Sequence, residues 1–131
     1  MTTIAVCISL AFSGHACTAP YHDDRGGHAL PETNVQIGQR LAADQGWTGG
    51  AWDCLYRLWS RESGWDVTKS NYGGSGAYGI PQSLPGSKMA SAGADWLTNA
   101  ATQIRWGIGY VRARWGDPCS ALQNSTDRGW Y

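Results

Sequence analysis

The stretch A-W-D-C-L-Y-R-L-W-S-R-E-S-G-W, residues 51–65, decides the fold. One side of it repeats at helical spacing and consists of Ala51, Leu55, Leu58 and Glu62. Gly64 follows at a position where a glycine commonly ends a helix. The pattern therefore predicts a helix whose buried side ends in a carboxylate, and this carboxylate belongs to one of only two glutamates in the chain.

The start of this helix is marked by Thr48, a residue type that caps helix N-termini. Trp47 and Trp52 flank Thr48 at the spacing of a hydrophobic staple, so we expect their rings to pack together. The helix is thus expected to begin just after Thr48 and to end before Gly64.

Glu62 has two interpretations. A glutamate at a helix end most often pairs with an arginine or caps a neighbouring segment, and its role is then structural. Here the rest of the stripe is apolar, the helix C-terminus adds negative potential, and a glycine-rich loop containing Tyr78 follows. These effects would raise the pKa of Glu62 from about 4.3 towards roughly 6 to 7, where a carboxylic acid can protonate a leaving oxygen at neutral pH. Glu62 is therefore a candidate general acid.

Two further helices are expected on either side of this one. Residues 34–45 carry a short amphipathic pattern, which Gly46 ends. Asn99 is a predicted N-cap for a longer helix that runs to Trp115, with Gly116 closing it. The sequence therefore predicts a small, mainly helical domain.

The helix that follows Asn99 is apolar on two sides. Its core stripe consists of Ile104, Ile108, Val111 and Trp115. Trp106 and Tyr110 form a second apolar patch, so the helix is expected to pack with one side and to line a cleft with the other. Gly107 and Gly109 each disfavour a helix by about 1 kcal/mol relative to Ala, which suggests the close approach of another backbone.

The segment N-Y-G-G-S-G-A-Y-G-I-P-Q, residues 71–82, contains a formal G-x-G-x-x-G. A dinucleotide-binding loop of that form follows a buried strand and opens a helix, whereas Pro81 and Pro85 remove helical N–H groups here. We therefore reject that interpretation and expect a glycine-rich loop or short hairpin. The loop would return to the core and place Gln82 beside the active-site cleft.

The composition limits the partners of the protein. The chain has 131 residues, 42% hydrophobic and 15% charged, which suffices for one core. Ten Lys and Arg residues balance ten Asp and Glu residues, so no nucleic-acid partner is expected. Eight Trp and six Tyr residues suit a groove that binds sugar rings. We expect a monomer.

Residues 1–30 are a candidate signal peptide followed by a flexible lead-in. Residues 4–12 are mostly apolar and too few to span a membrane, although no Lys or Arg precedes Arg25. Residues 18–34 mix Pro, Gly and Asp with little periodicity. The folded domain is expected to cover residues 31–131.

Four cysteines bear on the cellular compartment. A bond between Cys54 and Cys119 would tie two predicted helices together and would contribute roughly 4 kcal/mol through chain entropy. Two free buried thiols are the alternative in a cytosolic protein. Cys7 would leave with a signal peptide, and Cys17 would be spare. The three histidines all precede residue 30 without the spacing of a zinc site, so no metal is expected.

Several motifs in register resemble one known family. They are R-E-S-G-W at residues 61–65, S-G-A-Y-G-I-P-Q at 75–82, N-A-A-T-Q-I-R-W-G at 99–107 and the closing G-W-Y. Together they resemble the lysozyme-like lytic transglycosylases of actinobacterial secreted proteins and their phages, over about residues 35–131. The resemblance implies an α+β lysozyme-like domain, secreted or associated with the cell wall, that acts on peptidoglycan glycan strands without a cofactor.

The resemblance also implies roles for individual residues. Glu62 matches the catalytic acid of the family, and Ser63 beside it is implied as a substrate-binding residue. The loop residues implied at the sugar-binding cleft are Tyr78, Ile80 and Gln82. The final Trp130 and Tyr131 match an aromatic pair, which implies that Tyr131 lies near Glu62. Relatives often have a Trp and a His after the second cysteine, where this chain has Leu122, Gln123 and Asn124.

Three functions fit these residues. A lytic transglycosylase needs one carboxylate, because the 6-hydroxyl of the substrate takes the place of water. A hydrolytic muramidase usually needs a second carboxylate, for which neither Asp66 nor Asp95 has a clear claim. The remaining alternative is a non-catalytic peptidoglycan-binding module or a phage structural protein that kept the groove.

Overall fold

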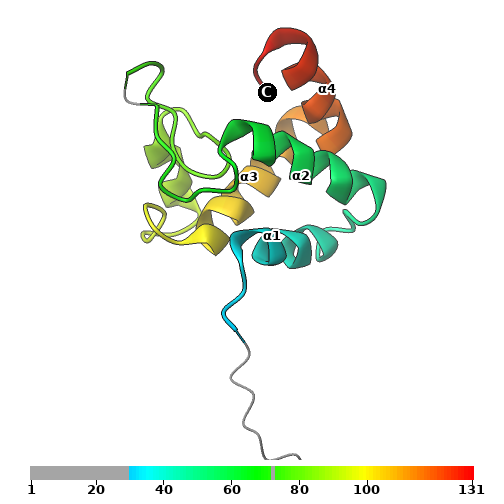
Figure 1. The fold of residues 1–131 in the computed structure, drawn as a ribbon, viewed down its shortest axis with the longest axis horizontal. Coiled ribbons are helices and arrows are strands. Elements are labelled where there is room, and N and C mark those ends of the chain that lie inside the picture. The colour runs from blue at the N-terminus through cyan, green and yellow to red at the C-terminus, as the bar shows by residue number, and fades with distance from the viewer. Residues whose placement is uncertain (1–29, 72) are drawn as a thin grey trace, which may run out of the picture. The chain divides into compact units, whose positions relative to one another are not determined.

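The computed structural model describes residues 30–71 and 73–131, and these are mainly helical. The elements are α1 (Asn34–Ala43), α2 (Gly50–Glu62), the 3-10 helix η1 (Gly86–Ser91), α3 (Ala100–Trp115) and α4 (Pro118–Arg128). They belong to one compact unit, Pro31–Tyr131, in which α2 runs between α1 and α4 (Figure 1). The mainly helical prediction is thus confirmed. The candidate signal peptide, Cys7, Cys17 and the histidines lie outside the described residues.

The helix starts follow local side-chain chemistry. Thr33 and Gln36 form a capping box at the start of α1. The carboxamide oxygen of Asn99 accepts hydrogen bonds from two backbone N–H groups at the start of α3, which confirms the predicted N-cap. The prediction of Thr48 as N-cap of α2 is wrong. Gly49 takes that position with φ +52°, a conformation that glycine adopts without a steric penalty.

The predicted staple residues have other neighbours. The ring of Trp52 lies 5.6 Å from the ring of Trp65, and Trp47 lies under the guanidinium of Arg112 at 5.2 Å. Trp65 is buried and has φ +63°, directly after Gly64 ends α2 with φ +62°. The chain therefore turns sharply at the end of α2, as the glycine predicted.

The core contains side chains from all four α-helices. Leu55, Leu58 and Trp59 of α2 are fully buried, as are Ile104 and Val111 of α3. The stripe on α2 that was predicted from spacing thus faces the interior, and Glu62 lies at its end. This arrangement brings the carboxyl group to the edge of the core.

Of the two glycines predicted to mark a close approach, only Gly107 does so. A Cβ atom at Gly107 would overlap the side chains of Trp59 and Pro81, so the neighbours are side chains and not backbone. A Cβ atom at Gly109 would have no atom within 4 Å. Gly107 therefore lets α3 pack against α2 and the following loop.

A disulfide joins Cys54 of α2 to Cys119 in the first turn of α4, with the Cα atoms 5.0 Å apart. The predicted pairing is confirmed, although Cys119 lies within a helix that the sequence reading had not identified. A disulfide fits an oxidising compartment. None of the described helices has the length and hydropathy needed to cross a membrane.

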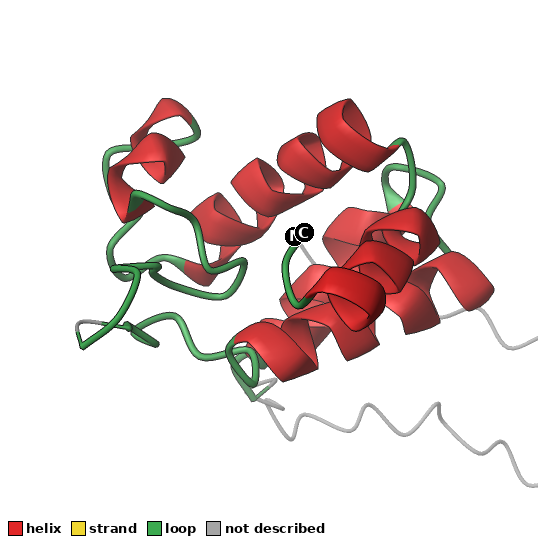
Figure 2. Cartoon of the chain, turned by 90° about the horizontal axis from the view of Figure 1, so that it is seen from above, coloured by secondary structure: helices red, strands yellow, loops and turns green. Residues whose placement is uncertain are grey.

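The segment between α2 and α3 consists of loops and η1 (Figure 2). Two isolated antiparallel bridges, Ser70 to Tyr78 and Tyr78 to Ser83, hold it in place of regular strands. The buried carboxamide of Gln103 accepts a hydrogen bond from the N–H of Ile80 at 2.9 Å and donates to two loop carbonyls. The glycine-rich loop is thus fastened to α3.

Candidate active site

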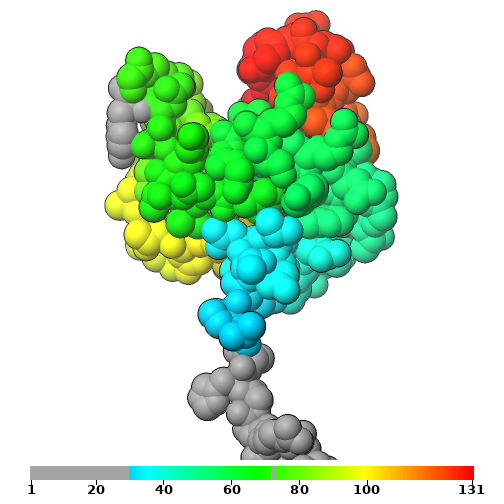
Figure 3. Space-filling model, in the orientation of Figure 1, coloured from blue at the N-terminus to red at the C-terminus, as the bar shows by residue number. Residues whose placement is uncertain are grey.

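Glu62 is the last residue of α2 and is half-buried. The molecular surface is hollowed between the loop that follows α2 and the C-terminal segment (Figure 3). The hydroxyl of Ser125, on α4, donates a hydrogen bond of 3.3 Å to Oε1 of Glu62. Within residues 30–71 and 73–131, no Lys or Arg forms an ion pair with this carboxylate. The site therefore contains an acid that is not neutralised by a cation.

The surroundings of Glu62 favour its protonated form. Burial raises the pKa of Glu62 above its ordinary value, while the Ser125 hydrogen bond and the charge of Arg61 lower it to a smaller extent. Arg61 points its guanidinium to the hydroxyl of Thr126 at 2.9 Å. Ser125 bonds to Oε1, so Oε2 is the oxygen available to carry a proton. The raised pKa lets this group keep its proton to higher pH than an exposed glutamate would, as a general acid requires.

Tyr131 lies next to Glu62 and is held on several sides. Its hydroxyl donates to the carbonyl of Pro81 at 2.6 Å and accepts from the indole N–H of Trp59 at 2.9 Å. Burial raises the pKa of Tyr131 well above its usual value, and the nearby Glu62 carboxyl raises it further. Tyr131 therefore stays a neutral phenol and fixes the C-terminal segment beside the acid.

A pocket of about 100 Å³ opens beside Tyr131. Its lining consists of Pro81, Gln82, Ser83, Leu84, Lys88, Trp106, Tyr110 and Tyr131. The rings of Trp106 and Tyr110 are stacked with centroids 5.3 Å apart and planes inclined by 11°. Four of the predicted site residues, Gln82, Trp106, Tyr110 and Tyr131, thus share one pocket. Glu62 is not part of its lining and adjoins it through Tyr131.

Ser63 and Ile80 lie elsewhere than expected, since both are buried. The Ser63 hydroxyl donates to the carbonyl of Ile80 at 2.8 Å and accepts from the N–H of Trp65 at 3.1 Å. These bonds join the end of α2 to the glycine-rich loop. Both side chains therefore support the site from inside and do not line the pocket.

Tyr78 also lies outside the pocket lining. Its hydroxyl donates to the carbonyl of Leu97 at 2.8 Å, and its ring meets Trp96 edge to face with centroids 5.6 Å apart. Tyr78 thus connects the loop to the segment that precedes α3.

The two candidate second carboxylates are engaged locally. Asp66 accepts from the backbone N–H and the hydroxyl of Thr68, both at 2.8 Å, and these bonds lower the pKa of Asp66. Asp95 accepts from Thr102 at 2.7 Å and from Asn99 at 2.6 Å, which lowers the pKa of Asp95. Both are exposed, and neither lines the pocket. Each therefore acts as a local turn or helix-end acceptor.

Ser125 and Lys88 are among the residues at the site that the sequence did not predict. Ser125 belongs to α4, whose start is signalled by Asp117 as N-cap and Pro118 in the first turn. Recognising that helix would have placed Ser125 on its buried side, four residues after Ala121. Lys88 had no such signal, because its position depends on how the loop folds back.

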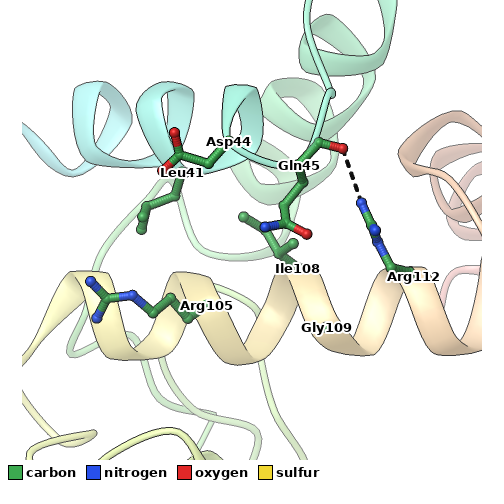
Figure 4. A pocket seen from close by; sticks show the side chains of 7 residues that line it. All are labelled: Leu41, Asp44, Gln45, Arg105, Ile108, Gly109 and Arg112. Carbon is green, nitrogen blue, oxygen red and sulfur yellow. Dashed lines mark hydrogen bonds between the residues drawn. The ribbon is translucent and has the colours of Figure 1, made fainter.

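A larger pocket of about 290 Å³ lies between α1 and α3 (Figure 4). Its lining consists of Leu41, Asp44, Gln45, Arg105, Ile108, Gly109 and Arg112. Arg112 donates to the carbonyl of Gln45 at 3.0 Å across one end. None of the predicted site residues lines this pocket, so volume alone does not identify the site.

No family model, curated protein or solved structure matches the chain. Its function is therefore inferred from its own motifs and from the geometry around Glu62.

Proposed function

We propose that residues 31–131 form a lysozyme-like lytic transglycosylase that cleaves the β-1,4 bond between N-acetylmuramic acid and N-acetylglucosamine in peptidoglycan. The observation that carries the proposal is the half-buried Glu62, whose raised pKa and lack of an ion-pair partner in the described chain suit a general acid. The motifs around residues 61–65 and 75–82 support the same substrate by their resemblance to that family.

The reaction needs only this one side chain for proton transfer. Protonated Glu62 gives its proton to the bridging oxygen as the bond from that oxygen to the muramyl anomeric carbon breaks. The muramyl 6-hydroxyl oxygen then bonds to the anomeric carbon, and its proton passes to the Glu62 carboxylate. The product carries a 1,6-anhydro ring, no water is consumed, and the enzyme regains its starting protonation state.

The neighbouring carboxylates favour this scheme over hydrolysis. A retaining or inverting hydrolase places a second carboxylate across the scissile bond. Asp66 and Asp95 are exposed and bonded to local groups, and both have lowered pKa values. Because their oxygens are engaged in local hydrogen bonds, these two groups support a scheme in which Glu62 is the only carboxylate that transfers protons.

The pocket beside Tyr131 is suited to sugar rings. The stacked Trp106 and Tyr110 offer aromatic surface, and the carboxamide of Gln82 supplies a polar group in the lining. This combination fits a ring with apolar faces and polar rims. We therefore assign the pocket to the glycan strand, and we propose that the protein works in the cell wall, outside the cytoplasm, where its disulfide would persist.

Digestion of purified sacculi, followed by analysis of the products, tests the proposal. The wild-type protein should release 1,6-anhydro-muropeptides, and Glu62→Gln should fold but release them at least about 100-fold more slowly, because general acid catalysis is lost. Glu32→Gln is the matched control, since this exposed glutamate pairs with Arg40 at 2.8 Å and should be dispensable. Circular dichroism verifies that both variants fold.

The product pattern separates the alternatives. Reducing muramyl ends in place of anhydro ends would identify a hydrolytic muramidase. Sacculus binding without any released fragment would identify a non-catalytic wall-binding module. Wild-type activity in Glu62→Gln would remove Glu62 from the mechanism.

A further inference from the structure

The pocket beside Tyr131 contains a charged residue that neither the motifs nor the reaction scheme accounts for. Lys88 lies on η1 and is the only residue of the pocket lining whose side chain carries a formal charge at neutral pH. The other lining groups are a carboxamide, hydroxyls, aromatic rings and apolar side chains. The pocket therefore contains one cationic side chain, although the charged side chains of the chain as a whole are balanced.

The ammonium group of Lys88 is uncommitted. Across the described part of the chain it has no hydrogen bond and no ion pair, whereas Arg40 and Arg112 each have a polar partner. Its side chain is exposed. Lys88 is not among the groups that shift the pKa of Glu62, whereas the charge of Arg61 lowers that pKa. Lys88 is thus free to meet a ligand without disturbing the acid.

The backbone that carries Lys88 is well anchored. Met89, the next residue, is fully buried. A Cβ atom at Gly86 would overlap the side chain of Tyr78, so the start of η1 packs closely against the glycine-rich loop. The short helix therefore holds the exposed Lys88 side chain at the pocket.

We propose that Lys88 is a substrate-binding residue that recognises a carboxylate on the glycan strand, and that the pocket therefore selects acidic muramyl glycans over neutral ones. This inference depends on the proposed function. The carboxylate has two sources, the lactyl group of a muramyl residue without peptide and the acidic residues of a stem peptide. Both offer the same partner to an ammonium group.

Binding measurements on the inactive Glu62→Gln protein test this inference without turnover. The probes are soluble muramyl glycan with stem peptides, the same glycan stripped of peptides so that the lactyl carboxylate is free, and chitohexaose, which is neutral. Lys88→Met should weaken binding of at least one acidic glycan by roughly tenfold, the size of one charge-assisted hydrogen bond. Chitohexaose binding should not change, and Lys88→Arg should retain the preference.

The two acidic probes distinguish the sources of the carboxylate. A Lys88→Met effect on the peptide-free glycan identifies the lactyl group, and an effect confined to the peptide-bearing glycan identifies the stem. Lys69→Met is the control, because Lys69 is the other lysine of the chain and does not line the pocket. The preference should also shrink as salt is added.

Failure of the inference and failure of the proposed function give different results. The Glu62→Gln protein is the parent of these variants. If it binds the glycans, and Lys88→Met then weakens the binding of acidic and neutral probes equally or leaves both unchanged, the inference is overturned while the proposed function stands. If the parent protein binds no glycan at all, both are overturned.

Discussion

The two ends of α2 are joined to the same helix, α4, in different ways. Near its start, Cys54 is bonded covalently to Cys119. At its end, Glu62 meets Ser125 through a hydrogen bond of 3.3 Å between side chains. The first contact is permanent under oxidising conditions, and the second can strengthen or weaken as Glu62 changes its charge. The comparison leads us to propose that the disulfide end of the helix pair provides stability and that the end with Glu62 provides the proposed chemistry.

Removal of the covalent end should have the largest effect on stability. The double variant Cys54→Ala/Cys119→Ala opens a loop between residues 65 positions apart, which should lower the free energy of unfolding by roughly 4 kcal/mol. Urea unfolding followed by Trp fluorescence measures this difference. Catalysis by the folded fraction should persist, because neither cysteine lines the pocket.

Two other results would contradict the roles assigned to the two ends of α2. A loss of stability under about 1 kcal/mol would mean that the packing of α2 on α4 needs no covalent support. A fully folded double variant without activity would mean that the disulfide also sets the geometry at Glu62, and the two ends of the helix would then not be separable.

The second largest effect is expected at Ser63, which joins the Glu62 end of α2 to the glycine-rich loop. Ser63→Ala removes the hydrogen bonds to the buried carbonyl of Ile80 and the N–H of Trp65, so it should destabilise by about 1–3 kcal/mol. Thermal unfolding measures the loss. Ser87→Ala is the control, because Ser87 is exposed on η1, and its stability should match the wild type. Equal stability of Ser63→Ala and Ser87→Ala would contradict a structural role for Ser63.

The sequence predicted what depends on local spacing. The stripe on α2 placed Glu62 at the edge of the core because helical periodicity fixes which side chains share a side. Asn99 and Gly64 marked helix ends because their side-chain and backbone chemistry acts over a few residues. The aromatic patch of Trp106 and Tyr110 was also visible, since a helix that is apolar on two sides has a second surface to cover.

What the sequence did not predict depends on how distant segments meet. The family resemblance implied that Ser63 contributes to substrate binding, but at a helix end the next residue points in another direction, here towards Ile80. Helix α4 has few large apolar residues, so periodicity alone did not reveal it or place Ser125. Lys88 reaches the pocket only because the preceding loop folds back onto α3.

The smallest and most specific effect is expected at Ser125, where the Glu62 end of α2 meets α4. The Ser125 hydroxyl stabilises the Glu62 carboxylate and lowers the pKa of Glu62, against the larger effect of burial. Ser125→Ala should therefore raise that pKa further. A general acid must be protonated, so kcat/KM falls as pH rises through the pKa of Glu62, and the variant should move this alkaline limb to higher pH. The movement should be under about one pH unit, since one unit corresponds to about 1.4 kcal/mol.

A pH profile distinguishes this role from a merely structural one. Damage to the packing of α4 would lower kcat/KM at every pH and leave the limb in place, whereas loss of the hydrogen bond moves the limb. Ser125→Thr retains a hydroxyl and should return the limb towards the wild-type position. Arg61 and Tyr131, the other groups that interact with Glu62, are unchanged in both variants. A limb that stays in place or moves to lower pH in Ser125→Ala would show that the bond to α4 does not tune the acid, and the distinction between the two ends of α2 would then rest on the disulfide alone.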